Sequence, residues 1–262
     1  MNYAEMVPSK VRSLIRNGQF TGPTAGMANG YTQANLVILP KELAFDFFLF
    51  CQRNPKPCPV LDVIEPANVA PMLLAPDADI RTDVPKYRIY LHGELVDEPL
   101  DMFSVWSDDL VGFLLGCSFT FEQALMTGGI QMRHLEIGSN VPMYKTNIQC
   151  IEAGPFHGPM VVSMRPIPYE DVVRTVQITS RFPAVHGAPI HIGSPSVIGI
   201  SDLGLPDFGD PVPIKPGETP VFWACGVTPQ AVAVQSKPAL MITHAPGHMF
   251  VTDRRDSDFA VL

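Results

Sequence analysis

Hydrophobic residues along this chain occur in short runs separated by proline, glycine and other turn residues. Eight runs have the length and composition of β-strands: residues 35–39, 59–64, 87–91, 144–151, 160–164, 190–193, 220–224 and 239–243. Six stretches have the length or spacing of helices: residues 9–17, 41–51, 108–115, a helix beginning at Thr120, 169–179 and 228–236. The pattern therefore predicts a protein that mixes strands and helices.

The order of these elements suggests how the chain is organised. Residues 141–209 contain a strand–strand–helix–strand series, which is typical of a two-layer α+β module. The strand, helix and strand of residues 220–243 have the order of a βαβ unit, which predicts a parallel strand pair. We therefore expect an α/β fold. It comprises a three-layer α/β/α domain with a mixed, partly parallel sheet, formed by residues 1–140 and 210–262, and a smaller inserted α+β module, residues 141–209.

Composition and charge narrow the class of protein. Of the 262 residues, 46% are apolar and only 17% are charged, which is typical of a chain with a large core. The net charge is −8 at pH 7, whereas nucleic-acid binding needs a basic face, so we expect no nucleic-acid partner. A small anionic substrate is compatible with this charge because it needs only a few local donors.

The sequence also carries signals about location. The N-terminus lacks the apolar segment of a signal peptide, and the longest apolar runs are too short to cross a membrane. We therefore expect a cytoplasmic protein without membrane partners, in which the five cysteines are free thiols. The formation of a homo-oligomer is left open.

The main chemical signal is a motif that occurs twice. Cys117 and Cys225 each follow an apolar run, and Thr120 and Thr228 stand three residues later, where a predicted helix begins. The free N–H groups at a helix N-terminus favour a thiolate, so we expect lowered thiol pKa values, and they can also bind a carboxylate. Two such thiols on either side of a small acid can exchange protons with it. The alternative is that each cysteine is a small buried residue behind a helix cap.

Acidic and histidine residues supply further candidates for acid–base chemistry. Asp207 and Asp210 flank Phe208 in a proline- and glycine-rich loop, where apolar surroundings can raise a carboxyl pKa, although ordinary turn chemistry also places Asp there. His244 ends the strand of residues 239–243. Strand ends border the ligand crevice in open α/β sheets, so His244 and Cys225 become neighbours if their strands pair.

Several residues are candidates for substrate binding. Arg165 and Arg181 are natural carboxylate clamps, although surface ion pairing is the common role of arginine. The glycine-rich loop of residues 21–26 and Asn35 can contact a substrate. That loop is neither a P-loop nor a dinucleotide fingerprint, so we expect no organic cofactor. Glu122 is interpreted as a first-turn charge that complements its helix dipole.

Ten sequence blocks, in order from residue 20 to residue 253, resemble the hydro-lyase family, also called the D-glutamate cyclase family. They include TGPTAGMANGYTQANLVILP, GCSFTFEQAL, ITSRFPAVHGAPIHIG, DLGLPDFGD, FWACGVTPQ and THAPGHM. The resemblance implies a carbon–oxygen lyase that eliminates water. The family name suggests the cyclisation of D-glutamate to 5-oxo-D-proline. The resemblance does not identify the acting residues.

These observations predict a hydro-lyase that acts on a small amino or hydroxy carboxylic acid by acid–base chemistry. The expected catalytic residues are Cys117, Cys225, Asp207, Asp210 and His244, and the expected binding residues are Arg165, Arg181, Thr120, Thr228 and Asn35, with no metal site. One alternative is a protein that binds a small acid without catalysis. Another is a metal-assisted hydratase or hydrolase that uses His186, His191, Asp207 and Asp210, although structural roles are expected for both histidines.

Overall fold

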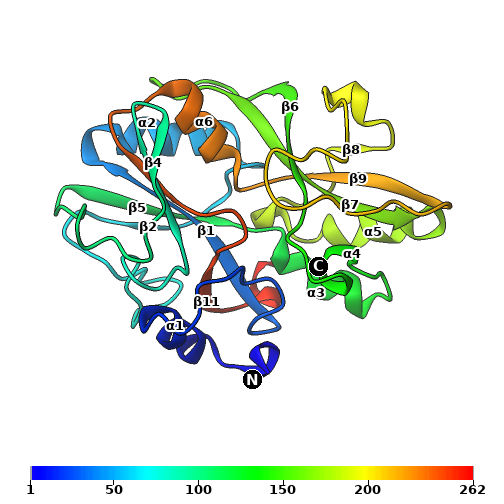
Figure 1. Ribbon diagram of the computed structural model, residues 1–262, viewed down its shortest axis with the longest axis horizontal. Coiled ribbons are helices and arrows are strands. Elements are labelled where there is room, and N and C mark those ends of the chain that lie inside the picture. Colours follow the sequence, from blue (N-terminus) through cyan, green and yellow to red (C-terminus); the bar gives the residue numbers. More distant parts are fainter. Residues whose placement is uncertain (1, 262) are drawn as a thin grey trace.

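The structure is a computed structural model that describes residues 2–261 and contains two antiparallel sheets, which lie side by side in Figure 1. The larger sheet has the order β2-β5-β1-β10-β3-β4, and β11 also pairs with β1. Its strands are β1 (Tyr31–Pro40), β2 (Val60–Ile64), β3 (Tyr87–Leu91), β4 (Glu94–Asp97), β5 (Leu110–Gly116), β10 (Met241–His244) and β11 (Phe250–Arg255). The smaller sheet has the order β6-β7-β9-β8 and consists of β6 (Met143–Gln149), β7 (Pro159–Pro168), β8 (His191–Ile192) and β9 (Glu218–Ala224).

Helices surround the sheets and connect them. The α-helices are α1 (Pro8–Arg16), α2 (Lys41–Arg53), α3 (Phe119–Thr127), α4 (Arg133–Glu136), α5 (Val172–Thr179) and α6 (Thr228–Ser236). The 3₁₀ turns are η1 (Tyr3–Glu5), η2 (Tyr169–Asp171), η3 (Pro183–Val185), η4 (Pro195–Ile198) and η5 (Asp256–Phe259). Within residues 2–261, none of the helices combines the length and hydropathy that a membrane-spanning segment requires.

The core of the larger sheet is organised around β1, which is buried on both faces. Leu36 and Ile38 face a cluster that includes Ile80 and other apolar residues of the irregular segment between β2 and β3. Val37 and Leu39 point to the opposite face and pack with Phe47 and Phe50 of α2. Alternate side chains of a strand point to opposite faces, so a strand covered on both sides has a continuous apolar run.

The α/β class is confirmed, but the predicted parallel pair is wrong. Strands β9 and β10 do not pair: β9 belongs to the smaller sheet and β10 to the larger one, so α6 connects two sheets. All the strand pairs described are antiparallel. A strand–helix–strand order fixes neither the partner of each strand nor its sheet. The three-layer arrangement is not confirmed.

Two other boundaries differ from the expectation. Most of residues 108–115, predicted as a helix, belong to β5 (Leu110–Gly116), which is buried between β1 and β2. An apolar run of this length has no periodicity that separates a buried strand from a buried helix. The smaller sheet takes β9 from outside the predicted insert of residues 141–209. The division into two domains stays a prediction.

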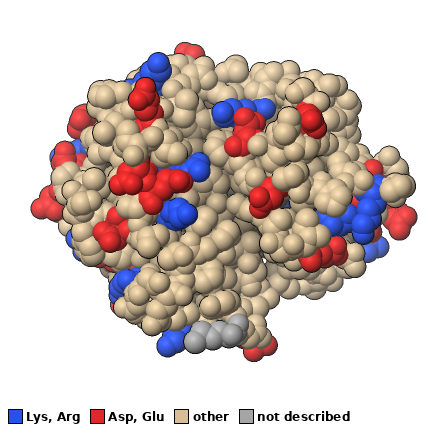
Figure 2. Space-filling model, viewed as in Figure 1, with Lys and Arg blue, Asp and Glu red and all other residues tan. Residues whose placement is uncertain are grey.

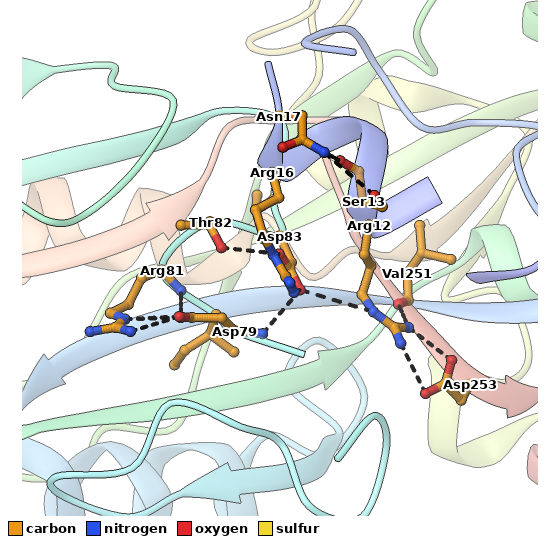
Figure 3. A network of polar contacts seen from close by, with 12 residues as sticks. Arg12, Ser13, Arg16, Asn17, Asp79, Arg81, Thr82, Asp83, Val251 and Asp253 are labelled. Carbon is orange, nitrogen blue, oxygen red and sulfur yellow. Dashed lines mark hydrogen bonds and ion pairs between the residues drawn. The ribbon is translucent and has the colours of Figure 1, made fainter. Parts of the chain in front are cut away.

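Helix α1 is fixed to the larger sheet by charged groups (Figure 3). Arg12 is buried and donates hydrogen bonds to the Val251 carbonyl at 2.9 Å and to the Asp253 carboxylate at 2.9 and 3.0 Å. Arg16 pairs with the fully buried Asp83 at 2.6 Å. These bonds attach the first helix both to β11 and to the irregular segment that precedes β3.

Candidate active site

Asn35 of β1 lies between the two cysteine-bearing turns. Its Nδ2 donates a 2.6 Å hydrogen bond to the carbonyl of Gly116, the residue before Cys117. A Cβ atom on Gly226, the residue after Cys225, would overlap the Asn35 side chain, so the two groups are in close contact. One buried amide therefore contacts both turns, and the ends of β5 and β9 meet here although they belong to different sheets. We call this region the sheet junction.

Cys117 and Cys225 lie in the two turns that Asn35 contacts, and their protonation differs from the prediction. Cys117 and Cys225 are only 6% and 7% exposed. Burial raises the pKa of Cys225 to about 11 and raises that of Cys117 further, although the Phe119 N–H, 3.5 Å from the Cys117 sulfur, acts in the opposite direction. The nearby Cys225 raises the pKa of Cys117 as well. Both thiols are therefore neutral at neutral pH and can donate a proton or a hydrogen bond, because desolvation outweighs the helix N-terminus.

The two threonines do not cap their helices. The hydroxyl of Thr228 accepts a hydrogen bond from the Val161 N–H at 3.0 Å and donates one to the Cys225 carbonyl at 2.7 Å, which fixes this turn to β7. The N-cap positions are Ser118 for α3 and Val227 for α6. The hydroxyl of Thr120 is buried and has no partner among the described residues.

Arg165 of β7 is buried at the sheet junction, with 1% exposure, and is bonded to Glu122 of α3. Its Nε donates to the Glu122 carboxylate at 2.8 Å, and its terminal nitrogens donate to the Ser163 and Ser118 hydroxyls at 2.8 and 2.9 Å. The guanidinium carbon also lies 5.4 Å from the centre of the Trp223 ring. Arg165 is thus held by protein groups. Its positive charge lowers the pKa of both thiols, but by less than burial raises it. Its predicted role as a direct carboxylate clamp stays a prediction.

Glu122 is a buried carboxylate, with 3% exposure, that the surrounding charges keep ionised. Burial alone would raise its pKa, but His134 and Arg165 together hold the Glu122 pKa below its ordinary value. The His134 Nε2 is 3.3 Å from the Glu122 carboxylate, without the alignment of a hydrogen bond. The sequence analysis interprets Glu122 only as a charge that complements the dipole of its helix, so it missed the pairing of Glu122 with Arg165. An arginine inside an apolar strand was the available signal, because a buried guanidinium requires an acidic partner.

Two buried histidines have one bonded and one unpartnered ring nitrogen within residues 2–261. His186 Nδ1 is 2.7 Å from the Lys56 carbonyl, and His244 Nδ1 is 3.2 Å from the Leu36 N–H nitrogen, one residue from Asn35. Burial lowers the pKa of each histidine to about 4, so both are neutral. The predicted pairing of the strands of His244 and Cys225 is wrong, but His244 still reaches β1 beside the sheet junction. His186 is expected to have a structural role, and its Nδ1 fits that role because it bonds to the Lys56 carbonyl. Its Nε2 has no hydrogen-bond partner among the described residues.

Asp207 and Asp210 lie in a different place, on an exposed groove of about 540 Å³. The Asp207 carboxylate accepts the Lys145 N–H at 2.8 Å, and Asp210 accepts the Asn140 N–H at 2.9 Å. The groove is also lined by Lys86, Arg88, Glu98 and His248, and we call it the mixed-charge groove. Figure 2 shows acidic and basic side chains interspersed over the face of the molecule that it draws. The structure does not unite these aspartates with the thiols.

A small pocket of about 30 Å³ is lined in part by the buried Glu122. Residues 26–31, which begin at the last residue of the glycine-rich loop, line it together with Gln33, Gln123 and Asp256. Next to it is an apolar groove of about 600 Å³, which shares Gly30, Gln123 and Asp256 with the pocket. Arg181 lies on this apolar groove, where its Nε donates to the Val261 carbonyl at 3.0 Å, and not at the sheet junction.

The residues named for a metal-assisted enzyme do not converge. No group of three or more His, Cys, Asp or Glu residues in the described part of the chain is arranged to hold a metal ion. His186 is buried beside Lys56, and His191 Nε2 bonds to the Ser194 carbonyl at 2.7 Å. The alternative with His186, His191, Asp207 and Asp210 as joint ligands is therefore wrong.

Comparisons with known proteins agree with the resemblance in the sequence. Residues 111–253 match the family described as D-glutamate cyclase. Relatives whose names describe them as hydro-lyases come from Bacillus licheniformis, 68% identical over the whole of both chains, Geobacillus kaustophilus, 67% identical over the whole of both chains, and Bacillus subtilis, 67% identical over 98% of this chain and all of the relative. A nitrogen repressor-like protein from Methanococcus jannaschii is similar only at a TM-score of 0.38 and 8% identity over 94% of this chain and 98% of that chain, which supports no inference.

These relatives and the mixed α/β structure define the class of protein, an α/β enzyme of the hydro-lyase type. The chain belongs to the D-glutamate cyclase family.

Proposed function

We propose that this enzyme removes water from a small amino or hydroxy carboxylic acid and that the cyclisation of D-glutamate to 5-oxo-D-proline is its reaction. The family and the relatives' names support the type of reaction. The observation that carries the proposal is the ionised Glu122, held by Arg165 inside the protein next to two neutral thiols. We also propose a reducing compartment such as the cytoplasm, because the five cysteines are buried and unpaired.

The reaction needs a base, an acid and a site for an anion, and no electrons are transferred. The substrate amine loses a proton and attacks the side-chain carboxyl carbon, which forms a C–N bond and a tetrahedral intermediate. A C–O bond then breaks, and the departing hydroxyl takes up a proton to become water. In the proposal Glu122 accepts the amine proton, and the thiols of Cys117 and Cys225 donate hydrogen bonds to the oxyanion of the intermediate.

The other predicted residues have supporting roles in this proposal. Asn35 and Thr228 hold the two turns in place, and Thr120 offers a buried hydroxyl beside them. Arg165 supplies positive charge at the sheet junction and Arg181 a carboxylate clamp in the apolar groove.

The test is product formation by the purified enzyme and by variants of the sheet junction. Wild type is incubated with D-glutamate, L-glutamate and related hydroxy acids, and 5-oxoproline is measured by mass spectrometry. We expect product from D-glutamate, a loss of about 100-fold or more in Glu122→Gln and of about 10-fold or more in Cys117→Ala and Cys225→Ala. The absence of product with wild type rejects the reaction. Full turnover by both cysteine variants removes the thiols from the mechanism.

The mixed-charge groove favours a second candidate function, the binding of a small zwitterion without catalysis. Lys86 and Arg88 can face its carboxylate, while Asp207 and Asp210 can face its ammonium group. For this function, glutamate raises the melting temperature of the protein and is recovered unaltered after long incubation. Conversion of glutamate during the incubation excludes it.

A further inference from the structure

The small pocket that reaches Glu122 has the size of a water site. Its volume of about 30 Å³ exceeds the roughly 10–15 Å³ that a single water molecule occupies and is far below the space that an amino acid needs. Its lining combines polar residues, Glu122, Asp256, Gln33 and Gln123, with apolar residues that include Phe119 and Met126. Water requires several polar partners, and this pocket supplies them.

The two carboxylates in the pocket come from different elements and have opposite environments. Glu122 comes from α3 and is ionised, as described above. Asp256 begins η5 and is half-buried, and burial raises its pKa to about 7, although the Thr32 hydroxyl, 3.1 Å from its carboxylate, and Arg255 act in the opposite direction. At neutral pH one carboxyl group can thus accept a proton while the other can donate one. Two carboxyl groups with separated pKa values are the arrangement of a general base and a general acid.

The pocket opens onto a space of substrate size. The apolar groove of about 600 Å³ lies in the usual range for small-molecule sites, about 300–1,000 Å³. Ile178 and Phe182 give it an apolar wall, and Arg181 lies on it. Asp256 lines both spaces and therefore stands at the boundary between the groove and the pocket.

We infer that the pocket between Glu122 and Asp256 is the site of the water that the reaction releases, and that the apolar groove binds a small carboxylic acid through its carbon chain and Arg181. The inference rests on the proposed function and adds Asp256 as a catalytic residue. It also gives the substrate class: acids with a short apolar chain and a carboxylate at the far end.

The proton transfers balance in this arrangement. The substrate reacts in the form with a neutral amine and a protonated side-chain carboxyl group, and Glu122 takes one proton from the amine nitrogen while the C–N bond forms. Asp256 gives its proton to the hydroxyl while the C–O bond breaks, and the water formed occupies the pocket. Glu122 is then protonated and Asp256 ionised, and the water between them can return the proton to Asp256. One water leaves for each substrate, and no other reactant is required.

The first test compares Asp256→Asn with Asp258→Asn, a neighbouring acid that does not line the pocket. Initial rates of 5-oxoproline formation from D-glutamate are measured from pH 5.5 to pH 9. We expect wild-type kcat to fall as the pH rises through about 7, because Asp256 ionises. Asp256→Asn loses about 100-fold in kcat together with this pH limb. Asp258→Asn retains the kcat and the limb, which moves only to a lower pH because the Asp258 charge raises the pKa of Asp256. Wild-type kcat and an unchanged pH profile in Asp256→Asn overturn the inference.

Other groups near Asp256 influence the pH at which it ionises. Arg255 and Asp258 act on its pKa from its own segment, Glu122 and Tyr31 line the same pocket, and Arg181 lines the apolar groove. The comparison of Asp256→Asn with wild type isolates the contribution of the Asp256 carboxyl group to the pH profile, because only this group is removed.

A binding test needs no turnover and uses glutarate as the probe. Calorimetry measures its Kd at pH 6 and pH 8. For wild type we expect about tenfold weaker binding at pH 8, because the ionised Asp256 repels the dicarboxylate. We expect no such change in Asp256→Asn, weak binding in Arg181→Ala, and recovery in Arg181→Lys. Wild type that does not bind glutarate, or binds it equally at both pH values, overturns the site. An enzyme that binds as expected but makes no 5-oxoproline retains the site and loses the proposed reaction.

Discussion

The sheet junction and the mixed-charge groove contain similar chemical groups but differ in their exposure to water. At the sheet junction Glu122 is buried and ionised because Arg165 and His134 compensate for the lost solvent. In the mixed-charge groove Asp207 and Asp210 remain hydrated and accept hydrogen bonds from backbone N–H groups, as turn aspartates usually do. The contrast indicates that a carboxylate gains unusual proton chemistry from its surroundings and not from its neighbours in the sequence.

The largest expected difference between the regions is the response of stability to acid. His186 and His244 have folded pKa values of about 4, below the ordinary value of about 6.5, so the unfolded chain binds more protons between these pH values. Their stabilisation is complete above pH 6.5 and is lost as the pH falls to 4, at about 1.4 kcal/mol per pH unit for each histidine. Urea unfolding at pH 7, 6 and 5 measures the slope.

Single substitutions identify the histidines responsible for the slope. His186→Asn and His244→Asn should each make the decrease with acid less steep. His92→Gln, at an exposed histidine, should leave the slope unchanged. If both buried variants retain the wild-type slope, other groups are responsible for the acid sensitivity.

The next largest effect concerns the charged pair of each region. Arg165→Met leaves Glu122 ionised and buried without its guanidinium, which should cost about 3–5 kcal/mol in the free energy of unfolding. Lys145→Met breaks the exposed pair with Asp207, 3.5 Å apart, and should cost about 0–1 kcal/mol. The double variant Arg165→Met with Glu122→Gln should recover part of the loss. Equal losses in the two single variants would contradict the contrast between the two regions.

A smaller effect tests the packing at the sheet junction. Gly226→Ala places a methyl group against Asn35 and should cost about 1–3 kcal/mol through overpacking. Gly22→Ala is the control, since a Cβ there meets only the Phe20 ring at 3.6 Å, and it should change the stability by less than about 0.5 kcal/mol. Asn35→Ala should relieve the strain of Gly226→Ala in the double variant, and additive losses would show that the two groups do not meet.

Local patterns predicted much of this fold, and the failures have physical causes. The ranges of α6 and β3 match the prediction because turn residues bound them and their patterns are unambiguous. The pairing of β9 with β8 and β7 depends on contacts between distant residues, so the βαβ expectation failed. For the site, the repeated cysteine motif predicted Cys117 and Cys225 as a facing pair, which stays a prediction, although Asn35 contacts both of their turns. It did not predict their raised pKa values, because desolvation depends on the packed surroundings of each thiol.

The smallest expected effect is on the stability of the mixed-charge groove. In Asp207→Asn the amide oxygen can still accept the Lys145 N–H, and the lost charge pair is exposed, so the free energy of unfolding should change by less than about 0.5 kcal/mol. Glutamate titrations of the same variant show whether the groove binds a zwitterion, since removal of one carboxylate then weakens binding while stability is unchanged. A loss of several kcal/mol in stability would instead mean that Asp207 supports the fold, and the two regions would then differ less than their exposure indicates.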